Sequence, residues 1–172
     1  VKELLDAGFL DGNCLTCTGE TLAEQIARLD PPKPDGEVLW SVTKPLKKTG
    51  GLRVLKGNLA PKGGAVIKVA GVEGGLDHGV FTGKARIFNN EEDLLDALNK
   101  TPDSFRDNDM VVIRYIGPRG APGMPELLDP TSRITTLCRQ KGITIALMTD
   151  ARFSGGSVGL VIGHVQPEAY VG

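Results

Sequence analysis

The segment Ile143–Val165, ITIALMTDARFSGGSVGLVIGHV, contains two apolar runs on either side of a polar segment with two adjacent glycines. Both runs are rich in aliphatic residues and short enough to be buried strands. The first run leads into an acid, Asp150, and a histidine, His164, lies at the end of the second. Loops that follow buried strands often carry binding or catalytic groups, because a rigid scaffold holds them. The segment therefore predicts two strands joined by a candidate functional loop.

This loop, residues 149–156 with the sequence TDARFSGG, places a guanidinium and a hydroxyl beside two glycines. The Arg152 fork suits a carboxylate or a phosphate. Gly155 and Gly156 offer backbone N–H groups next to the Ser154 hydroxyl, but a serine is a nucleophile or base only if its pKa is lowered. A glycine-rich loop with a serine is more often a simple turn, and FSGGS does not have the spacing of a GxSxG nucleophile elbow.

A second loop, residues 117–126 with the sequence GPRGAPGMPE, follows another strongly apolar run. Its glycines and prolines predict a stiff, shaped loop that presents Arg119 and Glu126. A glutamate carboxylate suits a hard cation such as Mg²⁺. The loop lacks the Gly-Lys-Ser/Thr ending of a P-loop, which argues against a nucleotide site.

The bulk properties are those of an ordinary globular protein. The 172 residues suffice for one domain with its own core, with 40% hydrophobic and 24% charged residues. A formal net charge of -1 gives no reason to expect nucleic-acid or membrane attraction. No apolar run approaches the roughly 20 residues that span a bilayer, and the N-terminus has no signal-peptide core, so the cytoplasm is the expected compartment.

The ends of the chain suggest a larger protein. The sequence starts at VKELLDAGFL without an initiating methionine and stops at PEAYVG without a closing element. We therefore expect a fragment of a longer polypeptide.

The three cysteines do not form a recognisable ligand set. Cys14 and Cys17 form a CxxC, which can bind metal or do redox chemistry. Neither His78 nor His164 lies in the paired motif that zinc requires. The odd cysteine count argues against a disulfide framework. We interpret the pair as two small, partly buried residues that precede a helix.

The pattern along the chain predicts many strands and few helices. Helices are expected at 1–10, at 18–29 with Thr18 or Thr21 as cap, at 89–100 with Asn90 as cap, and at 131–142. Strands are expected at 37–42, 52–57, 65–72, 80–88, 110–117 and 143–150. Because these do not alternate as in a doubly wound sheet, we predict a mixed α/β, mostly β, curved assembly with three or four flanking helices.

Several strings, in their order and spacing, resemble one enzyme family over nearly the whole chain. They are DGNCLTCTGETLAE, GGLRVLKGNLAPKGGAVIKVAGV, FTGKARIFNNEEDLLDAL, VVIRYIGPRGAPGMPE and TDARFSGGSVGLVIGHVQPEA. Together they are similar to the C-terminal part of the dihydroxy-acid dehydratase and 6-phosphogluconate dehydratase family.

The resemblance implies a closed or nearly closed β-barrel-like swivelling domain. In domain terms, we expect a single domain over 1–172, with a helical lead-in at 1–36 and a barrel-like core at 37–172. The resemblance also implies a small hydroxy-acid substrate, Mg²⁺ and an iron–sulfur cluster. It places the cluster ligands in an N-terminal domain, and implies a homodimer or homotetramer, with no nucleic acid or membrane partner. The isolated chain is therefore expected to be inactive.

The resemblance also assigns roles to residues. Ser154 corresponds to the family's serine base, which as an alkoxide takes the C2 proton, and Glu126 corresponds to a Mg²⁺ ligand. More loosely, the substrate carboxylate is expected to be lined by Arg152, Gly155, Gly156 and Ser157. Ala151 replaces a glycine that is common in relatives, which predicts ordinary backbone φ there.

The substrate is expected to be a sugar acid or phosphogluconate, which would give a 2-keto-3-deoxy acid. The runner-up is the branched-chain dihydroxy acid of amino-acid biosynthesis. A hypothesis of another class is a non-catalytic β-domain for binding or assembly. The sequence upstream of this chain would distinguish a non-catalytic domain from part of an enzyme, because only the enzyme needs cluster cysteines.

Overall fold

The computed structural model describes residues 1–61, 63–69, 72, 76–121 and 123–170. It divides the chain into two compact units, Val1–Thr49 and Gly50–Gly172. None of the helices in the described residues is long and apolar enough to cross a membrane. The predicted division at 36/37 remains a prediction.

The N-terminal unit contains α1 (Lys2–Asp6) and α2 (Leu22–Leu29). The strand predicted at 37–42 is wrong, since this segment has no strand. The Asp35 carboxylate accepts hydrogen bonds from the backbone N–H groups of Glu37, Val38 and Leu39, at 2.9, 2.9 and 3.0 Å. A turn closed by an aspartate competes with strand pairing for these donors.

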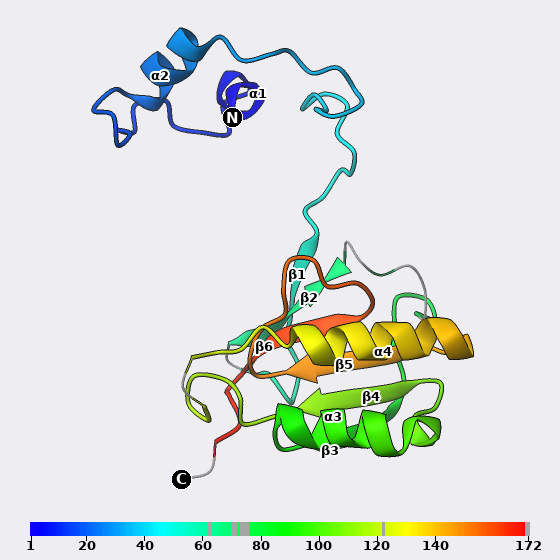
Figure 1. Cartoon of the computed structure of the whole chain (residues 1–172). Helices are drawn as coiled ribbons and strands as arrows, with labels where there is room; N and C mark the ends of the chain where they lie inside the picture. Colours follow the sequence, from blue (N-terminus) through cyan, green and yellow to red (C-terminus); the bar gives the residue numbers. More distant parts are fainter. Residues whose placement is uncertain (62, 70–71, 73–75, 122, 171–172) are drawn as a thin grey trace. The chain divides into compact units, whose positions relative to one another are not determined.

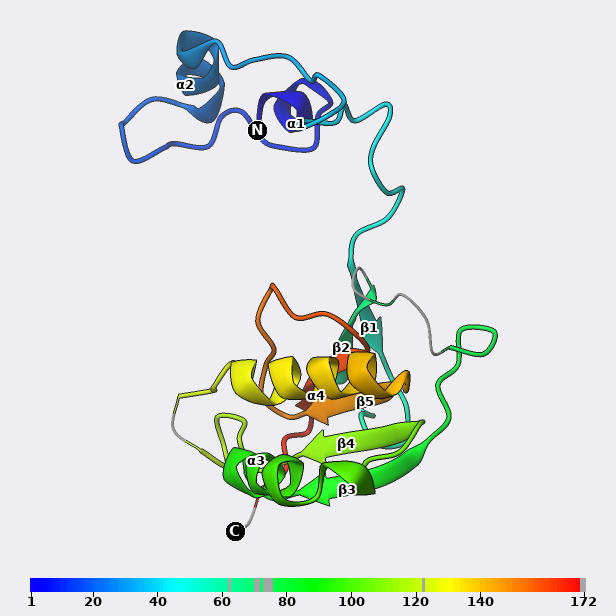
Figure 2. The same cartoon turned by 45° about the vertical axis from the view of Figure 1, so that its right-hand side comes forward.

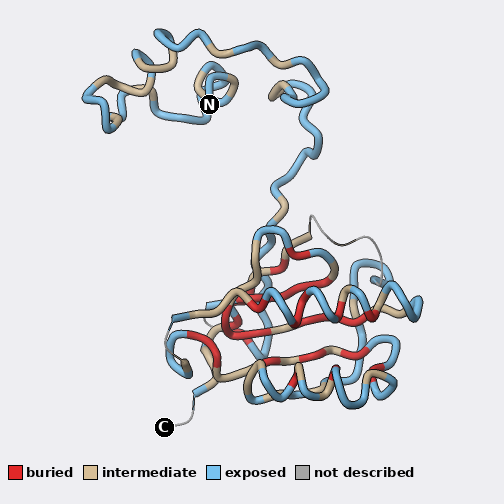
Figure 3. Tube along the Cα trace, viewed as in Figure 1, coloured by how far each residue is buried: buried red, intermediate tan, exposed pale blue. Residues whose placement is uncertain are grey.

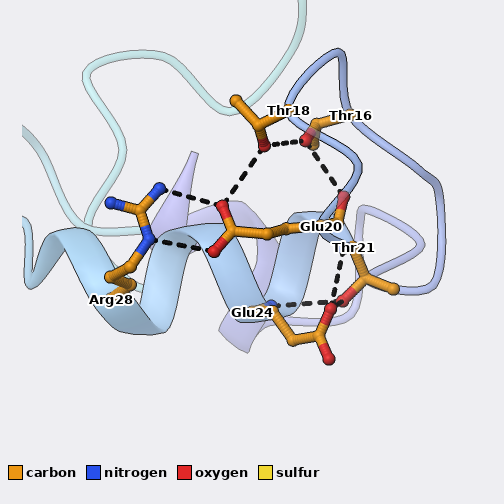
Figure 4. Close-up of polar contacts among 6 residues, drawn as sticks. All are labelled: Thr16, Thr18, Glu20, Thr21, Glu24 and Arg28. Atoms are coloured by element: carbon orange, nitrogen blue, oxygen red, sulfur yellow. Dashed lines mark hydrogen bonds and ion pairs between the residues drawn. The ribbon is translucent and has the colours of Figure 1, made fainter.

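Helix α2 begins where the sequence predicted, with Thr21 as its cap (Figure 4). The Thr21 hydroxyl accepts from the Glu24 N–H at 3.3 Å, and the Glu24 carboxylate accepts from the Thr21 N–H at 2.8 Å. This reciprocal pair is a capping box. Beside it, Arg28 donates to both Glu20 oxygens, at 3.0 and 2.8 Å. The hydrogen bond from Arg28 holds the pKa of Glu20 below its usual range.

We expect the order of α2 to decrease in acid. A carboxyl group with a lowered pKa stabilises the fold above its ordinary value of 4.5, and this contribution is lost as the pH falls through the folded-state pKa. The protection factors for amide hydrogen exchange across Leu22–Leu29, which correct for the pH dependence of the intrinsic rate, should therefore fall below pH 4.5. In Glu20→Gln, the loss of amide protection in acid should be smaller. Identical exchange profiles in acid for both proteins would contradict this role of Glu20.

The C-terminal unit is built on an open, mixed sheet of six strands within the described residues, in the order β1-β2-β6-β5-β4-β3. Strands β3, β4, β5 and β6 run parallel to one another, whereas β2 runs antiparallel to β6 and β1 runs antiparallel to β2. The bounds are β1 (Leu52–Leu55), β2 (Gly64–Lys68), β3 (Lys84–Phe88), β4 (Asp109–Ile113), β5 (Ile145–Thr149) and β6 (Val161–Gln166).

Helices α3 (Glu91–Lys100) and α4 (Leu128–Lys141) lie on the same face of this sheet (Figures 1 and 2). Asn90 caps α3 and Gly142, with φ +64°, ends α4, both as predicted. A short 3₁₀ helix, η2 (Pro102–Ser104), follows α3. The helices connect β3 to β4 and β4 to β5, so each strand returns beside its predecessor in the same direction.

The main core lies between these helices and the sheet, and buried residues follow the central strands (Figure 3). Its fully buried centre includes Leu94 from α3 together with Val111 and Ile113 from β4. A smaller cluster, with Ile67 and Ala146, covers the other face. Alternate side chains along β4 and β5 point to opposite faces of the sheet. Val111 and Ile113 therefore belong to the core beside the helices, whereas Ala146 belongs to the smaller cluster.

The mixed α/β class is confirmed, but the closed barrel is not. Within the described residues, the two edge strands of the sheet are β1 and β3, and they do not pair with each other. The crossover helices α3 and α4 keep the parallel strands in one twisted layer, which leaves both edges free. Of the described helices, α3 and α4 flank the sheet, whereas α1 and α2 belong to the other unit. Residues 70 and 71 of the strand predicted at 65–72 lie outside the described residues.

We expect the β4 position of Ile113 to dominate the stability of this unit. Ile113→Ala empties space at a residue with 0% exposure and should cost about 2–5 kcal/mol. Ile87→Ala on the neighbouring strand is the matched control, because Ile87 is 56% exposed, and it should cost about 1 kcal/mol or less. Urea unfolding of both variants measures the difference. If both variants lost the same free energy of unfolding, the placement of the core around Ile113 would be contradicted.

Candidate functional site

The Asp150 carboxylate joins the two candidate loops. Strands β4 and β5 are adjacent and parallel, with Ile113 opposite Thr149. Among the described residues, four backbone N–H groups donate to the buried Asp150 carboxylate at 3.0–3.3 Å. The donors are those of Tyr115, Ile116, Gly117 and Ala169. The start of the 117–126 loop and the C-terminal segment are therefore both fixed to the residue that follows β5.

Gly117 permits this close approach. A Cβ atom at this position would lie 2.8 Å from the Asp150 carbonyl oxygen and 3.1 Å from the Glu168 side chain. Only glycine avoids the backbone contact without displacement. Glu168 also accepts from the Arg119 N–H at 2.7 Å. Arg119 is therefore tied through its backbone to the C-terminal segment.

A cavity of about 460 Å³ opens beside the loop that carries Ser154. Its polar lining includes three of the predicted site residues, Arg152, Ser154 and Gly155. The remaining lining residues are Leu52, Val66, Lys68, Met124, Phe153, Val161, Gly163 and His164. The lining of the cavity therefore combines polar and apolar residues.

The Ser154 hydroxyl lies in a tight turn of its own loop. The Gly156 N–H donates to its Oγ at 3.3 Å, and the Ser157 N–H donates to the Ser154 carbonyl at 3.0 Å. A backbone N–H directed at the hydroxyl favours a negative charge on that oxygen. Ala151, before the loop, is fully buried and is not among the described residues with positive φ, as predicted.

Glu126 contacts the same loop through Arg152, because the Arg152 guanidinium forms an ion pair with its carboxylate. Their side chains are 42% and 41% exposed, so the pair is open to solvent and each partner can exchange it for another. The structure thus brings Glu126 next to the residue two positions before Ser154. The role of Glu126 as a metal ligand stays a prediction.

Gly156 and Ser157 face a different space. Both line a groove of about 310 Å³ against α4, in which Ser154 also takes part. Within the described residues, neither Gly156 nor Ser157 lines the larger cavity. The Ser157 Oγ is buried and has no hydrogen-bond partner in the described part of the chain. Their expected contact with a substrate carboxylate stays a prediction.

The cysteines do not gather in the structure. Cys14 and Cys17 are exposed, and Cys138 on α4 is partly buried, which raises the pKa of its thiol. No group of three or more histidine, cysteine, aspartate or glutamate side chains positioned for a metal occurs among the described residues. Glu126 therefore offers this loop pair one carboxylate toward a hard cation, and further ligands would have to come from elsewhere.

Two residues near the site were missed or misread from the sequence. Lys68 lines the cavity from β2, and the only signal was a lysine in the otherwise apolar run AVIKVAG. The sequence marked Asp150 only as the acid that follows an apolar run, whereas the structure shows that it is 5% exposed and accepts hydrogen bonds from backbone groups. An acid directly after a buried strand does not reveal such partners, because they come from distant segments.

Most of the chain matches the model of a known family. The C-terminal domain of the dihydroxy-acid/6-phosphogluconate dehydratases matches residues 37–172. The chain therefore belongs to the dihydroxy-acid and 6-phosphogluconate dehydratase family, and this stretch corresponds to that family's C-terminal domain.

Similar proteins are found over the whole chain. A dihydroxy-acid dehydratase from Mycobacterium sp. (strain JLS) is 49% identical over 172 residues, all of this chain and 28% of that protein. One from Leifsonia xyli is 52% identical over 169 residues, 98% of this chain and 28% of that protein. One from Chromohalobacter salexigens is 50% identical over 172 residues, all of this chain and 29% of that protein. The chain thus spans 28–29% of the length of these relatives.

We expect Asp150→Asn to loosen both loops. The amide keeps one acceptor oxygen but directs an NH₂ group at buried N–H donors, so the variant should lose about 3 kcal/mol of stability. Asp129→Asn is the control, because Asp129 is an exposed α4 acid paired with Arg133, and it should cost less than about 1 kcal/mol. Denaturant unfolding, together with hydrogen exchange at Tyr115–Gly117, tests this. If the two substitutions lowered stability equally, Asp150 would not be the residue that holds the two loops.

Proposed function

We propose that this chain is the C-terminal domain of a hydro-lyase that removes water from a 2,3-dihydroxy carboxylic acid to give a 2-keto acid. In this proposal Ser154 is the base that takes the C2 proton. The observation that carries it is the cavity, whose lining combines Ser154 and Arg152 with aliphatic and aromatic side chains.

The reaction requires a proton to leave C2 and a hydroxyl to leave C3. When Ser154 takes the C2 proton, the electron pair forms a C2–C3 double bond and the C3–O bond breaks. The leaving hydroxyl departs as water after it gains a proton, and the resulting enol tautomerises to the 2-keto acid. The Gly156 N–H on the Ser154 oxygen supports this role, because it stabilises an alkoxide more than a neutral hydroxyl.

The family implies Mg²⁺ and an iron–sulfur cluster, which when bound would supply Lewis-acid charge for the substrate carboxylate and the C3 hydroxyl. The residues of this chain fit a partial role in holding Mg²⁺. Glu126 supplies one exposed carboxylate of the type that Mg²⁺ prefers. Release of its Arg152 partner would leave that guanidinium free for the substrate carboxylate.

The character of the cavity bears on the substrate. Leu52, Val66 and Phe153 form part of its apolar wall, which suits an alkyl group better than a chain of hydroxyls. The three relatives reported above are all named dihydroxy-acid dehydratases. We therefore favour a branched-chain dihydroxy acid, which the sequence alone ranked second to a sugar acid. A comparison of 2,3-dihydroxy-3-methylbutanoate with gluconate as substrates decides between them.

We expect Ser154→Ala in the full-length enzyme to lose proton abstraction but keep its fold. Loss of a general base lowers kcat by about 10²–10⁴-fold. Exchange of the C2 proton in deuterated water, followed by NMR alongside turnover, should fall in parallel. Ser132→Ala, which removes an exposed α4 hydroxyl, is the control and should leave both rates unchanged.

Glu126→Gln gives a second, separable result. This variant should bind Mg²⁺ more weakly, so added Mg²⁺ should restore part of its activity, whereas Ser154→Ala should show no such rescue. If Ser154→Ala exchanges the C2 proton at the wild-type rate, the serine is not the base. A full-length protein without any dehydratase activity would instead favour the non-catalytic binding domain.

A further inference from the structure

The two glycines that follow Ser154 give their part of the loop no side-chain packing, whereas Phe153 before it packs against the main core. A Cβ atom on Gly155 would meet no heavy atom within 4 Å among the described residues, and one on Gly156 would meet only the Ser154 hydroxyl, at 3.9 Å. Adjacent glycines also leave the backbone many accessible conformations. A base at this position nevertheless needs a fixed geometry, because small displacements of a reacting group cost large factors in rate.

Lys68 reaches this loop from a distant part of the chain. Its Nζ donates to the carbonyl oxygen of Ser157 at 2.7 Å and also to the carbonyl oxygen of Gly155. The two acceptors lie within three residues of Ser154, on its C-terminal side. One ammonium group therefore holds two of the three carbonyls of the Gly155–Ser157 segment.

The sheet explains why Lys68 is available for this contact. Val66 and Lys68 alternate with Ile67 along β2, so the first two line the cavity while Ile67 packs in the smaller core cluster. Strand β2 pairs with β6, which starts just after the loop, with Ile67 opposite Ile162. Lys68 is thus fixed by a strand, while the loop that it contacts is not.

We propose that Lys68 is the positioning residue that holds the Ser154 loop in its reactive conformation. This inference rests on the proposed function of Ser154 as the base. Two charge-assisted hydrogen bonds replace the packing contacts that the glycines cannot make. The same contacts turn the two carbonyl oxygens toward Lys68, and the ammonium adds positive charge at the wall of the cavity where Ser154 lies. Lys68 itself need not touch the substrate.

The test uses the full-length enzyme with Lys68→Met, Lys68→Arg and Lys84→Met. Methionine keeps the length and apolar stem of the side chain but removes all three donors. We expect Lys68→Met to lower kcat and C2-proton exchange by about 10²-fold, with KM changed by less than about threefold. Arginine retains the charge and donors, so Lys68→Arg should recover most of the lost rate. Lys84, an exposed lysine on β3, is the matched control and should keep the wild-type rate.

The outcomes separate this inference from the proposed function. If Ser154→Ala loses C2 exchange while Lys68→Met matches Lys84→Met in kcat, Ser154 remains the base and the role of Lys68 is wrong. If Ser154→Ala keeps wild-type exchange, the proposed function itself fails. Thermal unfolding is measured for every variant. A loss of rate in Lys68→Met that Lys68→Arg does not recover, accompanied by an equal loss of stability in both, shows a purely structural lysine and also overturns the inference.

Discussion

The buried Asp150 carboxylate is the constraint on which the candidate site depends. Asp150 directly follows β5 and accepts hydrogen bonds from the start of the 117–126 loop and from Ala169 near the C-terminus. A buried carboxylate is costly unless charge-assisted hydrogen bonds compensate for its lost hydration. The segments that donate to it are therefore held in one arrangement, and Glu126 and Ser154 are delivered from two loops that share this junction.

Beyond this junction the site is held by polar contacts more than by packing. Arg152 pairs with Glu126, and Lys68 bonds the carbonyls that follow Ser154. Below the loops, the core between β4, β5 and the two helices is closely packed, with residues such as Ile113 fully buried. A rigid sheet thus supports loops whose groups can exchange partners.

The open sheet has a consequence for the cavity. Since β1 lies at an edge and its residues are exposed, Leu52 can form part of the apolar wall without being part of the core. In a closed barrel, the same position would contact a further strand. The cavity therefore lies beside the sheet, between the Ser154 loop and strands β1 and β2, and the placement of Lys68 on β2 follows from the same topology.

The sequence by itself indicated most helices and strands of the C-terminal unit and the two candidate loops. The apolar runs at β4 and β5, the Asn90 cap and the Gly142 stop are local signals, and the string RFSGGS indicated the serine loop. Only the tertiary structure decided that the sheet stays open, that Asp150 is an internal acceptor, and that Lys68 reaches the Ser154 loop. These features depend on contacts between residues far apart in the chain, such as Ile116 with Asp150 and Lys68 with Ser157. Hydrophobic period and capping report on neighbours in the chain, so they carry no information about such partners.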